Sequence, residues 1–528
     1  MGRDVRRAVT GEVDARPPGT GSTPVTFWEL LASTAERHPD RVVVADDHGR
    51  SLTSEQLRDA AERAAAGLGV RPGQIVSWQL PTVLESVVLM AALARVGAVQ
   101  NPVIPILRHR DVGLITSQVG TELFVAPESW RGFAHAEMGR ELGLDTYALE
   151  FDDPVGPELR LPMGDPTSLP AAPSSGDEVR WIYFSSGTTA APKGARHTDE
   201  STMASSWAIV DQLGFATGDR YPIAWPVTHI GGIAMLTACL RAGGCLVLFD
   251  VFDPSTTPER MAAHRPTILG SALPFFRAYL DAQARHGDEP LFAELRTCTA
   301  GGAPTPPELV RELVETFGVP GVVQAYGLTE FPMATSATRD DAPDVLARSS
   351  GRVARGVQVR VVDRELRLKG AQCFRGYVDE TLDEDAFDDE GWFRTGDLGH
   401  LDDTGNVYIT GRLKDVIIRN AENISALEIE DVLLRHDAVA DVAVVGMPDS
   451  RTGERVVAVV RAEGGAEVNL QALVEHCLTE GLARQKCPVE LHFVDEMPRN
   501  PMGKVVKQQL AQALVERADA SSRGERLR

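Results

Sequence analysis

The sequence predicts an α/β protein with largely parallel sheets, followed by a small α+β unit. Apolar strand-like runs alternate with helical patterns over most of the chain, which is typical of parallel sheets joined by helices. The 528 residues are 43% hydrophobic and 24% charged, a globular composition that excludes a mainly disordered, collagenous or coiled-coil chain. Because the pattern changes character near residue 412, we place a domain boundary at 412–414.

Charge and cysteine usage exclude several classes of protein. The chain has 53 Lys and Arg against 75 Asp and Glu residues, and its net charge of −22 disfavours general nucleic-acid binding. Its six cysteines are scattered without a C-x-x-C pair, as is typical of thiols in a reducing compartment. The N-terminus lacks an apolar signal, and no apolar run reaches the ~20 residues of a membrane span. We expect a cytoplasmic protein without a membrane span.

The large N-terminal part begins after a leader. Residues 1–24 are rich in Gly, Pro, Thr and charge and predict a flexible segment. Thr53 and Gln56 have capping-box spacing, and an apolar stripe follows at helical intervals over 57–68. The other elements expected here are a buried helix at 84–97 and strands at 75–78, 121–126, 181–184, 244–249, 267–270, 321–325 and 357–362.

The part beyond the boundary predicts a compact α+β domain. We expect the large domain to span 25–412, the small domain 413–517, and a disordered tail, charged and polar, 518–528. The elements expected in the small domain are helices at 426–436 and 469–482 and strands at 440–446, 455–462 and 489–494.

A loop rich in hydroxyl groups follows the strand expected at 181–184. Its sequence, SSGTTAAPKG, occupies residues 185–194. Its glycine lets the backbone approach a ligand, its hydroxyl and N–H groups can donate to phosphate oxygens, and Lys193 adds a positive charge. The segment does not match the pattern G-x-x-x-x-G-K-[ST]. By itself it is either a phosphate-binding loop or a flexible connector.

Four more motifs follow downstream. They are Tyr326–Glu330 (YGLTE), Gly391–Asp397 (GWFRTGD), Gly411–Asp415 (GRLKD) and Pro498–Lys504 (PRNPMGK). With five motifs in this order over about 320 residues, the chain resembles the adenylate-forming superfamily of acyl-CoA synthetases, firefly-type luciferases and adenylation domains. The resemblance implies a large N-terminal domain of stacked mixed α/β sheets with a smaller β-subdomain, and a small mobile α+β C-terminal domain.

Taken singly, these residues have more than one interpretation. A carboxylate at Glu330 suits Mg²⁺, which prefers oxygen ligands, but is equally common at a helix start. Asp397 can accept from both hydroxyls of a ribose or be a structural turn residue. Arg412 alone would be a surface ion-pair residue, Lys504 a solvated charge, and residues 301–304 a turn.

The resemblance assigns these residues to an ATP site. It implies that Glu330 and Thr188 hold Mg²⁺ and that Lys504 neutralises charge between the carboxylate and the α-phosphate. His229, within the segment WPVTHIGG, would lie beside the substrate carboxylate. The catalytic residues that the resemblance implies are therefore Lys504, Glu330, Thr188 and His229. The implied ATP-binding residues are Ser185, Ser186, Gly187, Thr188, Thr189, Lys193, Gly302, Ala303, Pro304, Tyr326, Gly327, Thr329, Asp397, Arg412 and Lys504.

The resemblance also implies a second step with a thiol. Lys414 would be the hinge about which the small domain turns after adenylation. Arg419, Ala421 and Glu422 would then line the channel for CoA.

Three positions and one short segment depart from the family pattern. Ala190 and Ala421 stand where relatives commonly have glycine, and Ala426 stands where they have proline. If the first two adopt positive φ, the strain is ~1–2 kcal/mol each and is expected to slow turnover. The segment 363–366 is shorter than in relatives, and we expect it to be peripheral.

The sequence thus predicts an ATP-dependent acid–CoA ligase with ATP, Mg²⁺ and CoA as cofactors. Amino-acid-activating relatives carry an Asp near His229, and its absence from 225–232 favours a plain carboxylic acid. Two stretches, 98–110 with its Arg108-His109-Arg110 and 130–133 (WRGF), are most similar to ligases for cyclohexanecarboxylate or short- to medium-chain acids.

Three alternatives stay open. The first is a ligase that loads a carrier protein, the second a luciferase-like oxygenase, and the third a catalytically impaired adenylate-binding or regulatory protein. The third is motivated by Ala190 and Ala421. The partners expected are a small carboxylic acid, ATP and CoA, without nucleic acid, and a homodimer is left open.

Overall fold

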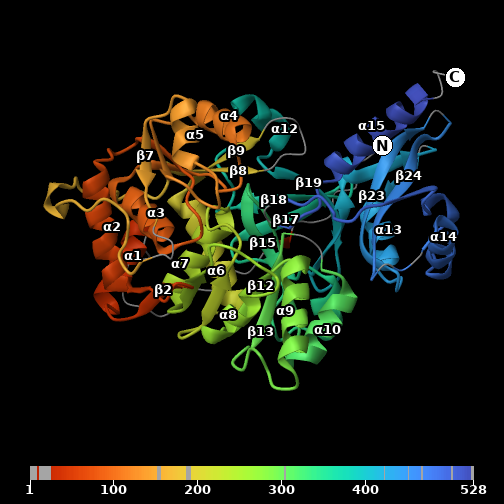
Figure 1. Cartoon of the computed structure of the whole chain (residues 1–528), viewed down its shortest axis with the longest axis horizontal. Helices are drawn as coiled ribbons and strands as arrows, with labels where there is room; N and C mark the ends of the chain where they lie inside the picture. Colours follow the sequence, from red (N-terminus) through yellow and green to blue (C-terminus); the bar gives the residue numbers. More distant parts are fainter. Residues whose placement is uncertain are drawn as a thin grey trace.

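A computed structural model of the chain describes most of its length, as a large body with a smaller domain at one end (Figure 1). The described residues are 9–10, 25–151, 156–185, 192–302, 305–420, 422–449, 451–464, 466, 468–500 and 503–524. The large N-terminal domain and the small C-terminal domain agree with the expected fold class.

A six-stranded sheet forms the first layer of the large domain. Its order is β7-β6-β4-β5-β8-β9, with all neighbours parallel except the antiparallel pair β8 and β9. The elements of this part are α1 (Phe27–Arg37), α2 (Ser54–Leu68), β4 (Ile75–Trp78), α3 (Leu84–Val96), β5 (Val99–Pro102), α4 (His109–Val119), β6 (Leu123–Pro127), α5 (His135–Glu141), β7 (Thr146–Leu149), β8 (Val179–Ser185), β9 (Lys193–Thr198) and α6 (Asp199–Leu213).

Two helices show how the sequence fixes local structure. The expected capping box is present at the start of α2, where the Thr53 hydroxyl accepts from the Gln56 N–H and the Gln56 amide oxygen accepts from the Thr53 N–H. Helix α3 is buried on nearly all sides, and this explains its almost continuous apolar sequence. Both predictions are confirmed.

Two further sheets complete the α/β body. One has the order β10-β11-β2-β3 and the other β12-β13-β14-β15-β16, and each combines parallel with antiparallel pairs. Their elements are β2 (Val42–Asp46), β3 (Ser51–Thr53), β10 (Arg220–Ile223), α7 (Ile230–Ala242), β11 (Cys245–Leu248), α8 (Thr257–Ala263), β12 (Ile268–Ser271), α9 (Leu273–His286), β13 (Thr297–Gly301), α10 (Pro307–Phe317), β14 (Val322–Leu328), β15 (Phe331–Ser336), α11 (Pro343–Arg348) and β16 (Arg352–Val353).

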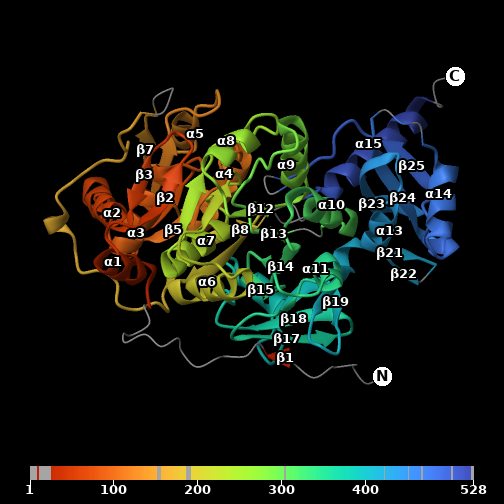
Figure 2. The ribbon, with the colours of Figure 1, turned by 90° about the horizontal axis from the view of Figure 1, so that it is seen from below.

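A smaller antiparallel sheet forms the β-subdomain, seen below the α/β body in Figure 2. Its order is β1-β17-β18-β19-β20, and its elements are β1 (Val9–Thr10), β17 (Val357–Val362), β18 (Glu365–Gly370), α12 (Asp383–Ala386), β19 (Phe393–Leu401) and β20 (Val407–Arg412). Strand β1 lies inside the expected flexible leader. The open edge of β17 accounts for this difference, because an unpaired edge readily takes a further strand.

The small domain packs three helices on a five-stranded sheet. Its elements are β21 (Val416–Arg419), β22 (Glu422–Ser425), α13 (Ala426–Leu433), β23 (Val439–Asp449), β24 (Gly453–Ala462), α14 (Leu470–Thr479), β25 (Glu490–Phe493) and α15 (Lys507–Gly524). Helix α15 continues through residues 518–524, where we expect a disordered tail. Leu510 and Leu514 anchor the helix in the core, and helical hydrogen bonding propagates cooperatively beyond such an anchor.

Two properties of the whole chain follow from these elements. All six cysteines are free thiols, in agreement with their scattered positions. Within the described part of the chain, every helix is too short or too polar to cross a membrane.

A buried charge network ties the first layers of the large domain together. Arg50 makes a bidentate contact with Glu85 of α3, at 2.7 and 2.9 Å, and a further contact with Asp46 of β2 at 2.8 Å. None of the three side chains is more than 8% exposed. Removing the guanidinium would leave two carboxylates buried without their partner, which is costly in a low-dielectric interior.

We therefore expect Arg50→Met to lower the free energy of unfolding of the large domain by about 3–5 kcal/mol. The matched control is Arg58→Met, because Arg58 makes its ion pairs with Glu55 and Asp59 on the surface of α2 and is expected to contribute under ~1 kcal/mol. Urea denaturation followed by tryptophan fluorescence measures both changes. Equal effects of the two substitutions would contradict the prediction.

Candidate active site

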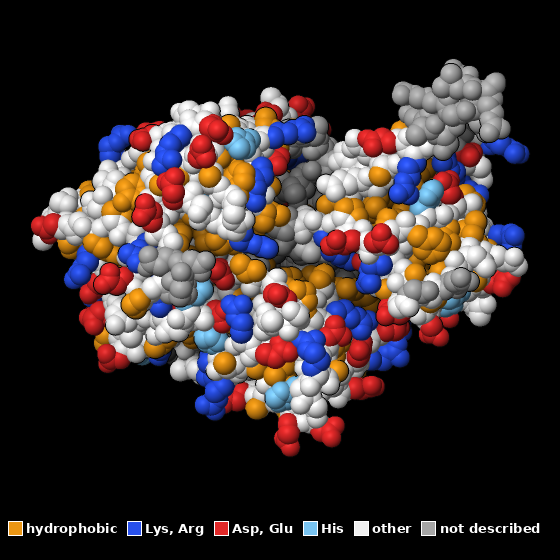
Figure 3. Space-filling view, viewed as in Figure 1, with side chains coloured by type: hydrophobic (Ala, Val, Ile, Leu, Met, Phe, Trp, Pro, Cys, Tyr) orange, Lys and Arg blue, Asp and Glu red, His pale blue; other side chains and the backbone are white. Residues whose placement is uncertain are grey.

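The motif residues meet at the carboxyl ends of the parallel strands. Ser185 ends β8, Gly302 follows β13, Tyr326 lies near the end of β14, and His229 follows β10 and precedes α7. Ligands of open α/β sheets bind at this edge, because the loops that leave the strands converge there. The space-filling view shows a hollow between the two domains (Figure 3).

Asp397 is the centre of a buried polar contact between three parts of the chain. It is 1% exposed and accepts a hydrogen bond from the Tyr326 hydroxyl at 2.8 Å. Arg412, which lies opposite it on β20, pairs with it at 2.6 Å between Nε and Oδ1. Three of the residues that the resemblance assigns to the ATP site are thus in direct contact.

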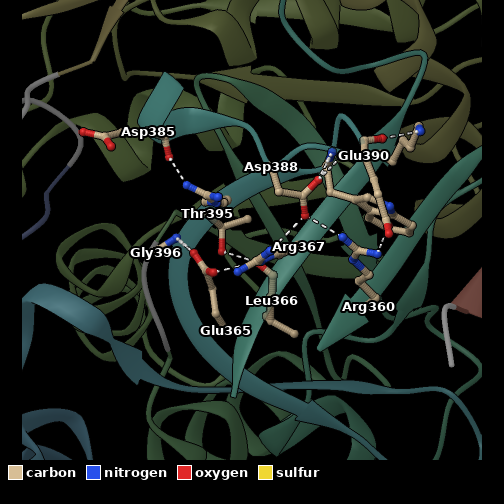
Figure 4. Close-up of polar contacts among 12 residues, drawn as sticks. Arg360, Glu365, Leu366, Arg367, Asp385, Asp388, Glu390, Thr395 and Gly396 are labelled. Atoms are coloured by element: carbon tan, nitrogen blue, oxygen red, sulfur yellow. Dashed lines mark hydrogen bonds and ion pairs between the residues drawn. The ribbon is translucent and has the colours of Figure 1, made fainter. Parts of the chain in front are cut away.

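A network of ion pairs and hydrogen bonds holds the part of β19 that carries Asp397 (Figure 4). Glu365 accepts from the Gly396 N–H at 3.1 Å and pairs with Arg367 at 3.0 Å, and Arg367 also contacts Asp388. The Thr395 hydroxyl donates to the Leu366 carbonyl at 2.6 Å and accepts from the Asp397 N–H at 3.0 Å.

This network corrects our expectation for residues 363–366. We expect the segment to be peripheral, yet Glu365 and Leu366 directly support the turn before Asp397. The error has a simple cause, since the pairing of β18 with β19 brings together residues about 30 positions apart.

Glu330 is held by a tyrosine that the sequence did not single out. Its carboxylate is 8% exposed and accepts from the Tyr377 hydroxyl at 2.7 Å. The Lys193 ammonium lies 5.4 Å from the centre of the Tyr377 ring. Tyr377 therefore links the expected magnesium ligand to the expected phosphate-binding lysine.

A buried histidine fixes the backbone beside Glu330. His197 contacts the Thr329 carbonyl through Nε2 at 2.8 Å and the Ser201 hydroxyl through Nδ1 at 2.9 Å. Burial lowers the pKa of His197 to about 4, so its ring is neutral at physiological pH. Its position in β9, a strand of ordinary composition, gave no sequence signal of this role.

His229 is half-buried at the start of α7. Its Nδ1 accepts from the Gly231 N–H at 3.1 Å, and its ring meets that of Trp225 edge-on. Burial, together with the charge of Lys504, lowers the pKa of His229 to about 4. The ring is therefore a neutral group beside Lys504, consistent with contact to a substrate carboxylate without added charge.

Lys504 reaches from the small domain into the large one. Its N–H donates to the Asn500 side chain at 2.9 Å within the tight turn that presents it. A Cβ at Gly302, whose φ of +82° favours glycine, would lie 3.4 Å from Lys504 Cε. Burial, with Arg412 nearby, lowers the pKa of Lys504 to about 8.

Some expected site residues lie outside the described residues. They are Ser186, Gly187, Thr188, Thr189, Ala190, Ala303, Pro304 and Ala421. Gly327 is described, and a Cβ there would lie 2.1 Å from the Pro332 carbonyl oxygen, so only glycine fits at this point of β14.

Two of the expected CoA-channel residues, Arg419 and Glu422, lie in the small domain. Arg419 and Glu422 pair with each other across the β21–β22 hairpin of the small domain, and both contact Gln485. Lys414 lies in the short turn between β20 and β21, at the domain boundary.

A cavity opens beside the motif residues. It is small, and its described lining includes Thr228, His229 and Thr329 together with Ile115 of α4. The remaining described residues that line it are Pro102, Val103, Ile104, Leu107, Tyr183, Phe184 and Ile230. Most of these lining side chains are apolar, and the polar ones are Thr228, His229, Thr329 and Tyr183.

The donor set fits a magnesium ion. One oxygen of Glu330 bonds to Tyr377, and the carboxylate retains lone pairs for a hard cation. Mg²⁺ is commonly held by one or two carboxylates together with substrate phosphates. Glu330 is a single buried carboxylate, and Lys193 lies across the Tyr377 ring from it. This arrangement suits a magnesium ion that is shared with substrate phosphates.

The two-domain fold, with its polar site at the domain boundary, is that of an adenylate-forming enzyme of the acid–thiol ligase class. Residues 31–378 match the AMP-binding enzyme family, and residues 428–504 match the AMP-binding enzyme C-terminal domain. The chain belongs to the AMP-binding enzyme family.

Relatives with known names extend over nearly the whole chain. A medium-chain fatty-acid–CoA ligase of Escherichia coli is 30% identical over 91% of this chain and 88% of its own. A sulfoacetate–CoA ligase of Cupriavidus necator is 33% identical over 92% and 97%. The ATP-bound structure of MatB from Rhodopseudomonas palustris has a TM-score of 0.81 at 27% identity, covering 93% of this chain and 99% of its own.

One prediction concerns Tyr377. We expect Tyr377→Phe to raise the Mg²⁺ concentration for half-maximal adenylation and to slow that step about tenfold, because a buried carboxylate that loses its hydrogen bond is destabilised by about 1–3 kcal/mol. The ring that faces Lys193 is kept, so the change isolates the hydroxyl. Tyr279→Phe is the matched control, since that buried hydroxyl bonds to Gly270 away from the site. An unchanged Mg²⁺ dependence would refute the role given to Tyr377.

A second prediction concerns pH. The Lys504 ammonium is protonated below its pKa of about 8 and loses its charge above it. We therefore expect kcat/KM for adenylation to fall as the pH rises through about 8, because this parameter reports the free enzyme. In Lys504→Arg the descending limb should move upward, since a guanidinium stays protonated. Pyrophosphate release measured against pH checks this, and identical profiles for the two enzymes would count against it.

Proposed function

We propose that this protein is an ATP-dependent acid–CoA ligase that works in two steps. A carboxylic acid first reacts with ATP to give an acyl-adenylate and pyrophosphate, and the CoA thiol then displaces AMP. The observation that carries the proposal is the position of Lys504, a small-domain cation that reaches Gly302 and the Asp397–Arg412 pair of the large domain.

The first step needs charge neutralisation more than acid–base catalysis. A carboxylate must approach an anionic α-phosphate, and a preorganised cation at that point lowers the barrier most. Lys504 is half-buried and already reaches Gly302 of the large domain, so it requires little reorganisation. His229, neutral and adjacent, orients the carboxylate without competing for the lysine.

The nucleotide would be held from both sides of the boundary. Asp397 binds the ribose hydroxyls, Tyr326 lies against the adenine, and Arg412 supports Asp397. Glu330 and Thr188 would hold Mg²⁺, which would supply positive charge to the substrate phosphates. Lys193 and the hydroxyl-rich loop 185–189 contact the same phosphates.

The second step would follow a rotation of the small domain about Lys414. The turn at 413–415 is the short link between β20 and β21. Rotation there withdraws Lys504 and brings the β21–β22 hairpin, with Arg419 and Glu422, toward the acyl-adenylate.

The acid is proposed to be a plain carboxylic acid of short to medium or alicyclic form. No carboxylate occurs in 225–232 to pair with an α-ammonium group. The names of relatives span medium-chain fatty acids and sulfoacetate, so the family alone does not fix the acid. A pyrophosphate-release screen over aliphatic, alicyclic and aromatic acids identifies it, and no release with any acid would refute the proposed function.

The two-step assignment is tested by Lys504→Ala. We expect adenylation to fall about 100-fold or more, as on loss of a preorganised electrostatic group, while preformed acyl-adenylate is still converted to thioester. Lys486→Ala is the control, because Lys486 pairs with Glu428 at the surface of the small domain. Equal loss of both half-reactions in Lys504→Ala would contradict two separate domain arrangements.

A further inference from the structure

The turn that presents Lys504 is held in shape by hydrogen bonds of its own. The Asn500 N–H donates to the Lys504 carbonyl at 2.8 Å, and the Gly503 N–H donates to the Asn500 carbonyl at 2.8 Å. The Lys504 N–H donates to the Asn500 side chain at 2.9 Å. These bonds fix the shape of the turn, but they do not by themselves set its direction relative to the sheet of the small domain.

An arginine at the start of the turn connects it to that sheet. One terminal nitrogen of Arg499 donates to the Gly503 carbonyl, and the other pairs with the Asp441 carboxylate. Asp441 lies in β23 and is 7% exposed, and its second oxygen accepts from the Val442 N–H at 3.0 Å. A buried carboxylate is thus joined, through one planar cation, to the peptide bond directly before Lys504.

The direction of this peptide bond matters because the residue before it is a glycine. The φ of Gly503 is +79°, a region in which glycine has little conformational preference of its own. A Cβ at Gly503 would lie 3.6 Å from Pro274 of α9, and one at Gly302 would lie 3.4 Å from Lys504 Cε. The turn therefore meets the large domain at two points, and a change in its direction would displace the Lys504 ammonium.

A second ion pair holds the far side of the turn. Lys507, with which α15 begins, pairs with Glu430 of α13 at 2.7 Å. Glu430 also accepts from the Val444 N–H of β23 at 2.6 Å. Lys504 thus lies between two other cations, at 499 and 507, that are each anchored by a carboxylate of the small domain.

We propose that Asp441 and Arg499 are positioning residues for Lys504, which set the direction of the Gly503–Lys504 peptide and thereby the place of the ammonium during adenylation. The inference rests on the proposed function, which assigns Lys504 to that step. Asp441 and Arg499 act through Lys504 and not by contact with the acid or ATP. Their effect can be large, because a preorganised cation lowers the barrier only where it is correctly placed, and a shift of about 1 Å can cost up to ~100-fold in rate.

The positioning role belongs to one half-reaction. In the proposed second step the small domain has rotated and Lys504 is withdrawn, so the direction of its turn no longer affects the reaction. A purely structural contribution of the Asp441–Arg499 pair would lower both half-reactions, since both need a folded small domain.

The test uses Asp441→Asn in the full-length enzyme, a change that keeps the shape of the side chain and removes its charge. The acid is whichever of octanoate, cyclohexanecarboxylate and benzoate the wild-type enzyme activates fastest. We expect adenylation, measured by pyrophosphate release, to fall about tenfold, and the conversion of preformed acyl-adenylate to thioester to stay within about twofold of the wild type. Equal losses in the two half-reactions, or an unchanged rate of adenylation, would overturn the proposal.

Glu490→Gln is the matched control for adenylation. Arg455 likewise joins the Glu490 carboxylate to a backbone carbonyl, that of Pro448, but it does so at the opposite end of the β23–β24 pair from Asp441. We expect pyrophosphate release to stay within about twofold of the wild type in this variant. An equal fall in Glu490→Gln and Asp441→Asn would show a general effect of such ion pairs and would overturn the positioning role.

A double mutant gives a readout that a structural role would not produce. In Lys504→Ala there is no ammonium to position, so adding Asp441→Asn should cause no further fall in adenylation. A further tenfold fall would overturn the proposal. As a second variant, Arg499→Lys keeps the charge but replaces the planar fork by a single ammonium, and we expect a smaller loss that is again confined to adenylation.

The same measurements separate this inference from the proposed function. If Lys504→Ala itself left adenylation unchanged, the role of Lys504 in the proposed function would be refuted. If Lys504→Ala lowered adenylation and Asp441→Asn did not, only the positioning role of Asp441 and Arg499 would be refuted.

Discussion

The contact on which the site depends most is the buried pairing of Asp397 with Arg412 and Tyr326. It joins the end of a parallel strand, a turn of the β-subdomain and the last residue before the domain boundary. A carboxylate that is 1% exposed needs such partners, because its charge would otherwise be costly away from water. The ion-pair network around Glu365 and Arg367 exists in the same turn and keeps this carboxylate in place.

Charge distribution explains how an acidic protein can use anionic ligands. The net charge of −22 is spread over a surface rich in Asp and Glu, while Lys193, Arg412 and Lys504 lie close to the strand ends. Local fields within a few ångströms outweigh distant surface charge, which solvent and salt screen. The local charge at the site is therefore determined by a few positively charged residues and not by the overall composition.

Much of the fold could be predicted from the sequence because its signals are local. The capping box at Thr53 and Gln56, the buried helix 84–96 and the strand 357–362 each follow from neighbouring residues. Tyr377, His197 and Glu365 could not be found in this way. Each acts through a contact with a residue far along the chain, at 47, 132 and 31 positions, and nothing in its own neighbourhood marks it.

By itself the sequence determined the fold class and the identity of the motif residues, because periodicity and short motifs are encoded in contiguous residues. Only the tertiary structure decided how those residues meet. It brought Lys504 against Gly302, moved residues 363–366 from the periphery to the support of Asp397, and joined Asp441 to the turn of Lys504 through Arg499. The reason is physical, since burial, pKa and ion pairing depend on distances through space that the order of residues does not contain.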